Sequence, residues 1–197
     1  MTLNYTELQL DALRELANIG SGTAGTALSS MLGRAIDVSV PSAQVLSFAD
    51  AVDAAGPAEA QVSCVVMPIV GDIDALVVMI FREHDVAALY RLLGVDPGDE
   101  YAASALGEIG NIVGTSYVCA LGRMTAIEFE PKPPQTATDM LAAVVSSALV
   151  AGAGQGDVAL LLDSDLIVEG EACSLSFMLI PSEDGVNELL GRLGVGG

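Results

Sequence analysis

The chain has 197 residues, 52% of them hydrophobic, and its 26 acidic and 7 basic side chains give a formal net charge of −19. This length and composition predict a globular protein with one substantial core. The negative charge would repel nucleic-acid phosphates and anionic membrane surfaces, so we exclude nucleic acid and membrane from the predicted partners.

The first predicted element is a long amphipathic helix. Thr6 and Gln9 form a capping box, and small or apolar residues then recur at spacings of three and four: Leu10, Leu13, Ala17, Gly20, Ala24, Leu28 and Met31. The helix is expected to end near Gly33. Its segment Gly20 to Gly25 matches the G-x-G-x-x-G spacing of dinucleotide-binding loops, but such a loop follows a strand and opens a helix. Because these glycines lie inside a helix, nucleotide binding is rejected.

Two strands, a loop, a hairpin and a helix are expected next. The alternation in "AIDVSV" predicts a strand closed by Pro41, and a further strand is expected at residues 45–48. An acidic loop at 49–57 then leads to the hairpin strands "AQVSCVVMPIV" and "ALVVMIF", joined by "GDID". The segment "REHDVAALYRLLG" predicts a helix stopped by Gly94 and Pro97.

The second half of the chain repeats this order. It begins with a second long helix, "YAASALGEIGNIVGTSYVCALGRM", followed by the strand "TAIEFEP" and the helix "TDMLAAVVSSALVAG". The hairpin "VALLLDSDLIVEG" and "CSLSFMLIP" and the helix "SEDGVNELLGRLG" complete it. Glu15 aligns with Glu108 at an offset of 93, and Glu83 with Glu183 at an offset of 100, so about seven residues are added in the second half.

This duplication predicts an α+β fold. Two αββ-type units, at about residues 6–95 and 99–195, would form one pseudo-twofold domain spanning residues 1–197. Neither unit would bury its strands well alone, so we expect one sheet-centred core with the two long helices outside it.

Cysteine and histidine usage argues against disulfide and metal sites. Cys64, Cys119 and Cys173 are widely spaced without a C-x-x-C pair, so we expect three buried thiols in a reducing compartment. His84 is the only histidine and is expected on a helix surface. The uncharged run at 140–156 is short and too polar for a membrane span, and we interpret it as a buried helix that leads into a glycine-rich turn. With no signal peptide, the predicted location is the cytoplasm. The single lysine, Lys132, favours adaptation to high intracellular salt, with an ordinary acidic protein as the alternative.

Both long helices carry the same polar pattern along one face. Its members are Asp11, Glu15 and Asn18 in the first helix, and Ser104, Glu108 and Asn111 in the second. Small residues continue the two stripes, namely Gly22, Gly25 and Ser29, and Thr115. Glycine inside a helix is less stable than alanine by about 1 kcal/mol, so these glycines indicate close approach of another protein or helix.

The repetition of the pattern is what indicates function. With Pro41 and Pro134 the template [D/S]-x3-E-x2-N-x22-P occurs twice, whereas a single Glu-x2-Asn would be an ordinary solvated helix face. The duplicated template resembles the signature of the CheC family of chemotaxis phosphatases, in the group that also contains CheX and FliY. The resemblance covers nearly the whole chain, and two intact motifs match the CheC type.

The resemblance implies a protein phosphatase that hydrolyses the aspartyl phosphate of the response regulator CheY. Glu15 and Glu108 would each pair with a lysine of the regulator. Asn18 and Asn111 would each orient the attacking water, a task that suits a carboxamide because an acyl phosphate needs positioning more than proton removal.

Further expectations also follow from the resemblance. Asp11 and Ser104 would support the two sites. The chain would carry no cofactor, because the Mg²⁺ ion belongs to the regulator. The receptor deamidase CheD would be a second partner, bound by the small-residue helix face or by the helix near Met140. The alternative is an adaptor with weak or no catalysis that sequesters CheD or CheY.

Overall fold

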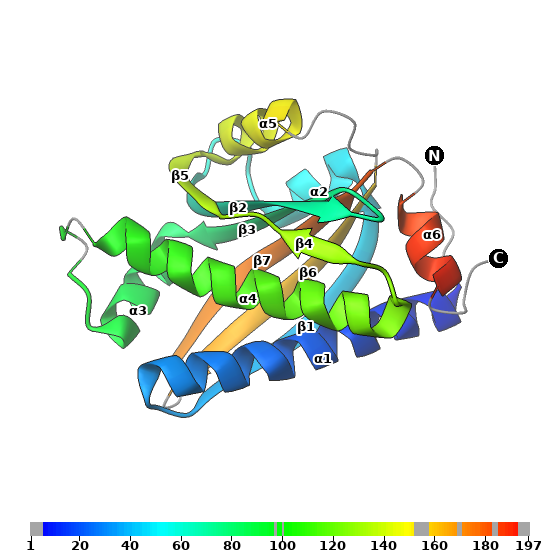
Figure 1. The fold of residues 1–197 in the computed structure, drawn as a ribbon. Helices are drawn as coiled ribbons and strands as arrows, with labels where there is room; N and C mark the ends of the chain where they lie inside the picture. Colours follow the sequence, from blue (N-terminus) through cyan, green and yellow to red (C-terminus); the bar gives the residue numbers. More distant parts are fainter. Residues whose placement is uncertain are drawn as a thin grey trace.

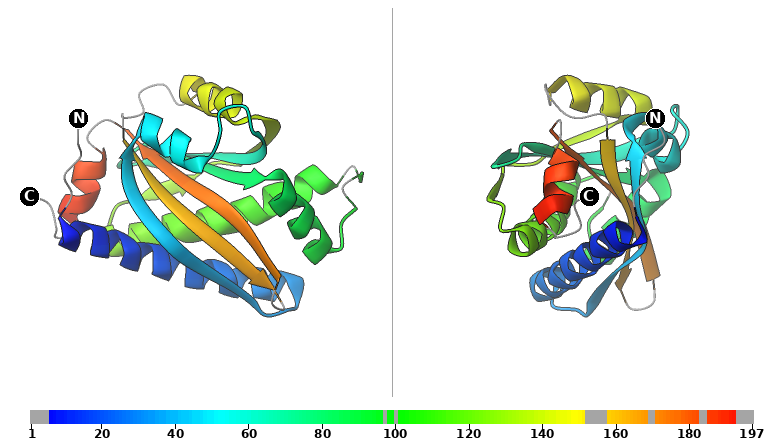
Figure 2. Two further views of the ribbon diagram at one scale, coloured as in Figure 1. Left: turned by 180° about the vertical axis from the view of Figure 1, so that it is seen from behind. Right: turned by 90° about the vertical axis from the view of Figure 1, so that its right-hand side faces the viewer.

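The computed structural model describes residues 6–96, 98–99, 101–151, 158–168, 171–182 and 185–192. Within these residues, seven antiparallel strands form one sheet, and helices cover both of its faces (Figure 1). The two long helices lie side by side on one face, and two shorter helices lie on the other (Figure 2). The predicted α+β class, with the long helices outside a single sheet, is confirmed.

The same order of elements occurs twice. The first half contains α1 (Glu7–Leu32), β1 (Ile36–Ser47), α2 (Phe48–Ala55), β2 (Gln61–Gly71), β3 (Ala75–Arg82) and α3 (Glu83–Leu93). The second half contains α4 (Ala102–Thr125), β4 (Phe129–Pro131), β5 (Gln135–Met140), α5 (Leu141–Ala151), β6 (Val158–Val168), β7 (Glu171–Pro181) and α6 (Gly185–Arg192). Apart from the short β4, each half runs helix, strand, helix, strand, strand, helix. The repeat limits and the single domain over 1–197 stay predictions, because both ends of the chain lie outside the described residues.

Each half of the chain completes the hairpin of the other half. The strand order is β1-β6-β7-β3-β2-β4, and β5 also pairs with β2. Thus β1 borders the second hairpin, β5 borders the first, and the two hairpins meet where β3 pairs with β7. A half on its own would keep only its two-stranded hairpin, which is marginally stable in water. Both long helices are therefore held by one shared sheet.

Two layers of apolar side chains attach the helices to the sheet. The layer beneath α1 and α4 includes Leu13, Leu28, Phe81, Val113 and Phe177. The layer beneath α2 and α5 includes Ala51, Val78, Leu141, Leu161 and Met178. Burying one large apolar side chain stabilises the fold by about 1.5–3 kcal/mol relative to leaving it exposed, so this packing fixes where the helix surfaces point.

The first helix forms where its capping box and apolar spacing predict it. The Thr6 side chain accepts a hydrogen bond from the Gln9 N–H, and Gly33 ends the helix in the left-handed conformation at φ 65°. The predicted inward positions are buried or half-buried except Met31, in the last turn, which is 43% exposed. Leu16, outside the predicted set, is also buried.

Two predictions for residues 36–57 are wrong. β1 continues past Pro41 to Ser47, because this edge strand has a register shift between Ser39 and Ser42 where a missing N–H is tolerated. The predicted acidic loop contains the helix α2 instead. The Ser47 hydroxyl caps that helix by accepting a hydrogen bond from the Asp50 N–H, and its alanine-rich sequence favours the helix.

Boundaries in the second half also differ from the prediction. Thr125 belongs to α4, and "TAIEFEP" supplies only the three residues of β4. Thr138 to Met140 belong to β5, a fully exposed strand that the sequence pattern does not predict because it has no buried face. The α5 helix is amphipathic rather than fully buried, with Leu141 and Val144 toward the sheet. The predicted glycine-rich turn at 152–157 lies outside the described residues.

Two of the three cysteines are buried, as predicted, but the third is not. Burial raises the pKa of Cys64 and of Cys173 to about 12. Cys119 is exposed on α4, which corrects that expectation. His84 lies on the surface of α3, as predicted, with its Nε2 atom 3.3 Å from Asp85 Oδ2. No helix in the described part of the chain has both the length and the apolar character needed to cross a membrane.

Candidate functional site

The two long helices run antiparallel and touch near their middles (Figure 1). A Cβ atom built on Gly20 would lie 3.1 Å from the Tyr117 Cα, so the absence of a side chain lets α1 approach α4 closely. Tyr117 is fixed from below, because its hydroxyl lies 3.1 Å from Ser164 Oγ and its ring centroid lies 4.7 Å from that of Phe177. Gly20, in the apparent nucleotide motif, is therefore a helix-packing residue.

Both helices bury their apolar residues against the sheet and turn the polar pattern outward. The exposed members are Asp11, Glu15, Asn18, Ser104 and Glu108, whereas Asn111 is half-buried. Each Glu lies three residues before its Asn on a regular helix, so the two side chains are neighbours on one face. The structure thus places the predicted residues on accessible helix faces.

The Glu and Asn side chains of the two motifs make almost no polar contacts with the rest of the described residues. Within the described residues, no hydrogen bond or ion pair engages the side chain of Glu15, Asn18 or Glu108. The Asn111 Oδ1 atom accepts one long hydrogen bond, 3.5 Å, from Thr115 Oγ1. These carboxylates and carboxamides are therefore free to bind groups of another molecule.

The two motifs have different surroundings. Asp11 accepts a 2.7 Å hydrogen bond from Arg14, so the first motif begins with an exposed ion pair. In the second motif Ser104 replaces the aspartate and Gly107 replaces the arginine. A Cβ atom on Gly107 would lie 3.4 Å from Thr136 of β5, so this strand borders the second motif.

The small-residue stripe beyond the first asparagine is only partly open. A Cβ atom on Gly22 would meet nothing within 4 Å, so the surface is low at this position. Gly25, predicted to continue that open surface, is instead covered by β1, where an added Cβ atom would lie 3.1 Å from the Ile36 carbonyl oxygen. The helical glycines thus serve packing at Gly20 and Gly25 and an open surface at Gly22.

The structure brings each Glu next to its own Asn but keeps the two motifs apart. Asn18 lies two residues before the Gly20 contact, and Asn111 lies six residues before Tyr117 on the antiparallel helix. At 1.5 Å per residue, the two asparagines are separated by roughly 12 Å along the helices. The chain therefore presents two separate candidate sites.

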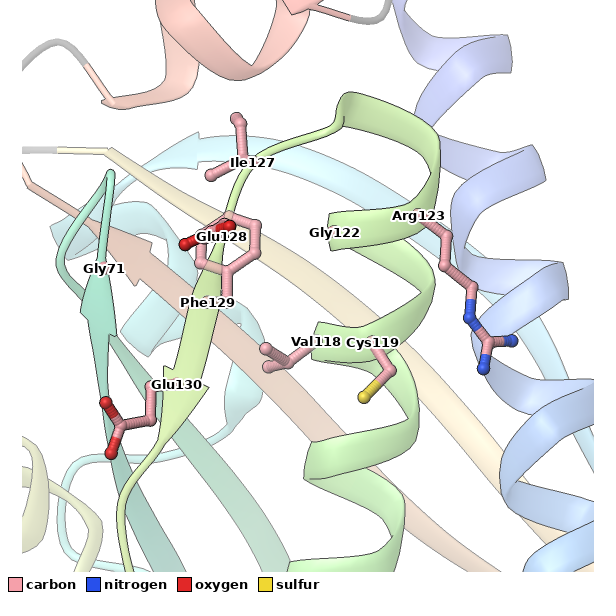
Figure 3. A pocket seen from close by; sticks show the side chains of 9 residues that line it. All are labelled: Gly71, Val118, Cys119, Gly122, Arg123, Ile127, Glu128, Phe129 and Glu130. Atoms are coloured by element: carbon pink, nitrogen blue, oxygen red, sulfur yellow. The ribbon is translucent and has the colours of Figure 1, made fainter.

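A hollow lies beyond each motif, between the helix and the following strand. One has a volume of about 490 Å³ and lies between α1 and β1; its lining includes Gly22, Thr26 and Asp37. The other, about 520 Å³, lies between α4 and β4 and is lined in part by Cys119 and Arg123 (Figure 3). Neither Arg123 nor Cys119 was predicted to be a site residue. The spacing signal was present, because Cys119 lies four residues after Thr115 and Arg123 four residues later.

The described residues contain no group of three or more His, Cys, Asp or Glu side chains placed to hold a metal ion. The expectation that the chain has no metal of its own stays a prediction. What both motifs offer is an exposed carboxylate for a cation and, beside it, an exposed or half-buried carboxamide that can donate and accept hydrogen bonds.

Comparison with known proteins identifies the family. The sequence matches the family model described as the CheC-like family over residues 8–44 and 102–137. It is also 31% identical, over 198 aligned residues, to the "CheY-P phosphatase CheC" of Bacillus subtilis (strain 168), with 95% of each chain covered. The chain belongs to the CheC-like family. The two matched segments contain both copies of the template, from Asp11 to Pro41 and from Ser104 to Pro134.

Solved structures have the same fold as this CheC-like chain. Thermotoga maritima FliY superposes with a TM-score of 0.76 at 21% identity, over the whole of both chains. The middle domain of FliM from H. pylori gives 0.68 at 14% identity, covering 95% of this chain and 99% of the other. The chemotaxis protein CheX from Desulfovibrio desulfuricans gives 0.54 at 17% identity, covering 85% and 99%.

Proposed function

We propose that this chain is a chemotaxis protein phosphatase that hydrolyses the aspartyl phosphate of a CheY-type response regulator. The proposal rests chiefly on one observation, the two copies of a Glu and Asn pair on the outer faces of α1 and α4, whose only side-chain hydrogen bond among the described residues is the long one from Thr115 to Asn111. Both copies lie in the segments that match the family, and the B. subtilis relative is named for this activity.

In this proposal the asparagines position water. The carboxamide of Asn18 or Asn111 enters the regulator's site and holds a water molecule in line with the phosphorus atom through one donated and one accepted hydrogen bond. Water adds to phosphorus, the bond to the aspartyl oxygen breaks, and inorganic phosphate leaves with the carboxylate restored. The carboxamide is not a base, which suits an acyl phosphate whose transition state depends on positioning and charge stabilisation.

The glutamates would orient the regulator. The carboxylate of Glu15 or Glu108 lies one helical turn from its asparagine and is free to pair with a lysine on the partner. Such a pair fixes how far the asparagine enters the site. The Mg²⁺ ion comes with the regulator in this scheme, and Asp11 and Ser104 support the helix face on which the pair stands.

The experiment that tests the proposal follows the decay of phosphorylated regulator. Wild-type protein, Asn18→Ala, Asn111→Ala and the double variant are compared at equal concentration and salt, with unfolding curves as a control for folding. We expect each single variant to keep part of the acceleration and the double variant to lose nearly all of it. A folded double variant that accelerates decay as well as wild type does would overturn the assignment.

The adaptor alternative is decided by the same assay. If folded wild-type protein never accelerates decay but binds the deamidase CheD or the phosphorylated regulator tightly, this chain is a sequestering module. CheD as a partner, and its binding surface, stay predictions. The two accessible Glu and Asn pairs favour catalysis, because a sequestering role would not need a carboxamide at the same place twice.

A further inference from the structure

The contact between the two long helices fixes which residues of α1 and α4 lie side by side. Gly20 and Tyr117 mark the contact, and the helices run in opposite directions (Figure 1). A residue a given number of positions before Gly20 is therefore level, along the helix pair, with the residue the same number of positions after Tyr117. Asn18, two residues before Gly20, is level with Cys119, two residues after Tyr117.

The same register places Arg123 at nearly the same level along the helix pair as the first glutamate. Glu15 lies five residues before Gly20 and Arg123 six after Tyr117, a difference of roughly 1.5 Å along the helices. Packed helices are about 8–10 Å apart, so an arginine on α4 can contact a partner that is docked on the neighbouring α1. Each site is thus bordered by the helix of the other repeat.

The second site is bordered in the same way, but by neutral residues. Thr26 lies six residues after Gly20 and is level with Asn111, six residues before Tyr117. Ser30, ten residues after Gly20, is within one residue of the level of Glu108, nine residues before Tyr117, and corresponds to Arg123 in the first site. Thr26 and Ser30 are both exposed on α1. In these bordering residues the two sites therefore differ by one positive charge.

The guanidinium of Arg123 is available to a partner. The side chain is exposed, and no ion pair engages it among the residues that the structure describes. Figure 3 shows it directed away from Glu128 and Phe129, toward the side of α4 along which α1 runs. By contrast, Arg14, Lys132 and Arg192 each pair with an acidic side chain of their own segment.

We propose that Arg123 is a specificity-determining residue of the first site, where it contacts anionic groups of the docked phosphorylated protein. The inference rests on the proposed phosphatase function. An aspartyl phosphate and the carboxylates that hold its Mg²⁺ ion are anionic, and a chain of net charge −19 repels them at long range. Arginine offsets this locally and forms bidentate contacts with phosphate or carboxylate. The first site then selects regulators with an acidic rim, and the second does not.

The test uses two backgrounds that each keep one site. Asn111→Ala leaves the first site, Asn18→Ala leaves the second, and Arg123→Gln is added to each. In the first-site background we expect KM for phosphorylated regulator to rise about 3- to 10-fold with kcat changed by less than about two-fold. In the second-site background neither value should change. Arg123→Lys should restore part of the lost affinity, and KM should rise more steeply with salt in the first-site background.

A matched control removes the same charge elsewhere. Arg91 is an exposed arginine on α3, outside both motifs, so Arg91→Gln changes the net charge equally. We expect this variant to leave KM unchanged in both backgrounds. An equal rise in KM for Arg91→Gln and Arg123→Gln would reduce the effect to net charge and overturn the inference.

The exposed thiol gives an independent test of which site α4 borders. In the folded protein Cys119 is exposed while Cys64 and Cys173 are buried, so a bulky maleimide reacts at Cys119. We expect the label to block decay in the first-site background and to leave the second-site background active. A Cys119→Ser variant treated with the same reagent should keep both activities.

The outcomes separate this inference from the proposed function. If neither background accelerates decay, the phosphatase proposal fails and the role of Arg123 fails with it. If both backgrounds are active but Arg123→Gln changes KM in both or in neither, the phosphatase proposal stands and the specificity role is wrong. Maleimide labelling that blocks only the second site would also overturn the arrangement.

Discussion

The two long helices carry the same motif, but the glycines near each motif pack against different parts of the protein. On α4, added Cβ atoms would lie 2.6 Å from Val65 at Gly110 and 2.5 Å from Met67 at Gly114, so α4 is seated directly on the sheet. On α1, Gly25 lies against β1, but Gly20 faces α4 and Gly22 faces open space. Both sites therefore lie on helices that pack on the sheet. The glycines next to the first asparagine face α4 and solvent, whereas the glycine next to the second asparagine faces the sheet.

Alkaline pH should produce the largest loss of stability, because it ionises buried groups of α4 and of the sheet. Burial raises the pKa of Tyr117, Cys64 and Cys173 to about 12, so these groups stay neutral in the folded protein while the unfolded chain ionises at lower pH. Their contribution is complete below about pH 9 and is lost as pH rises toward 12. Urea unfolding under reducing conditions measures this.

A variant supplies the control for the alkaline effect. Replacing Cys64 and Cys173 with alanine removes two of the three groups, so the free energy of unfolding should fall less between pH 9 and 11 than in wild type. A wild-type unfolding free energy that stays flat over this range would contradict the assignment of buried neutral thiols.

Gly110→Ala should give the largest effect of a single substitution. Its Cβ would lie 2.6–2.8 Å from three atoms of Val65, a buried residue of β2, so either the side chain or the helix must move. We expect a loss of about 1–3 kcal/mol in the free energy of unfolding. Denaturant titration measures it, and the second site should lose more phosphatase activity than the first because Asn111 is the next residue.

Tyr117→Phe should lower the free energy of unfolding by a smaller amount, and it changes the α4 residue that contacts Gly20 of α1. It removes the 3.1 Å hydrogen bond to Ser164, which is 1% exposed, and leaves that hydroxyl without its partner. The expected loss is about 1–2 kcal/mol, measured by denaturant unfolding. The companion variant Tyr117→Phe with Ser164→Ala should regain part of this loss, and a double variant less stable than the single one would contradict the explanation.

Gly22→Ala should have the smallest effect and the opposite sign. The position is helical, exposed and without neighbours, so alanine stabilises the helix by about 0.5–1 kcal/mol. If Gly22 also keeps the surface low for a docked regulator, KM at the first site rises while stability increases. Destabilisation by this substitution would show that the position is not open.

The sequence predicted those parts of the fold that have a periodic pattern or a cap. The capping box at Thr6, the long helices and both hairpins are confirmed because their buried faces repeat at helical or strand spacing. The strand β5 and the continuation of β1 past Pro41 were not predicted. Their formation depends on pairing with β2 and β6, which are distant in the chain, and not on a local pattern.

The same limit applies to the sites. Glu15, Asn18, Glu108 and Asn111 were found because a spacing repeats, and the structure places all four on accessible faces or close to them. The neighbours of each motif come from the other repeat, so the place of Arg123 beside the first motif requires the Gly20 contact with α4. The catalytic and supporting roles of the motif residues stay predictions.

In the proposed function the chain has two independent water-positioning sites. The most direct test is the initial rate of phosphorylated-regulator decay for Asn18→Ala, for Asn111→Ala and for wild type, at subsaturating regulator and with spontaneous decay subtracted. Independent sites predict that the two single-variant rates add up to the wild-type rate. If both single variants abolish the acceleration, the two motifs form one coupled site, and if only one of them does, a single motif is active; either result contradicts two independent sites.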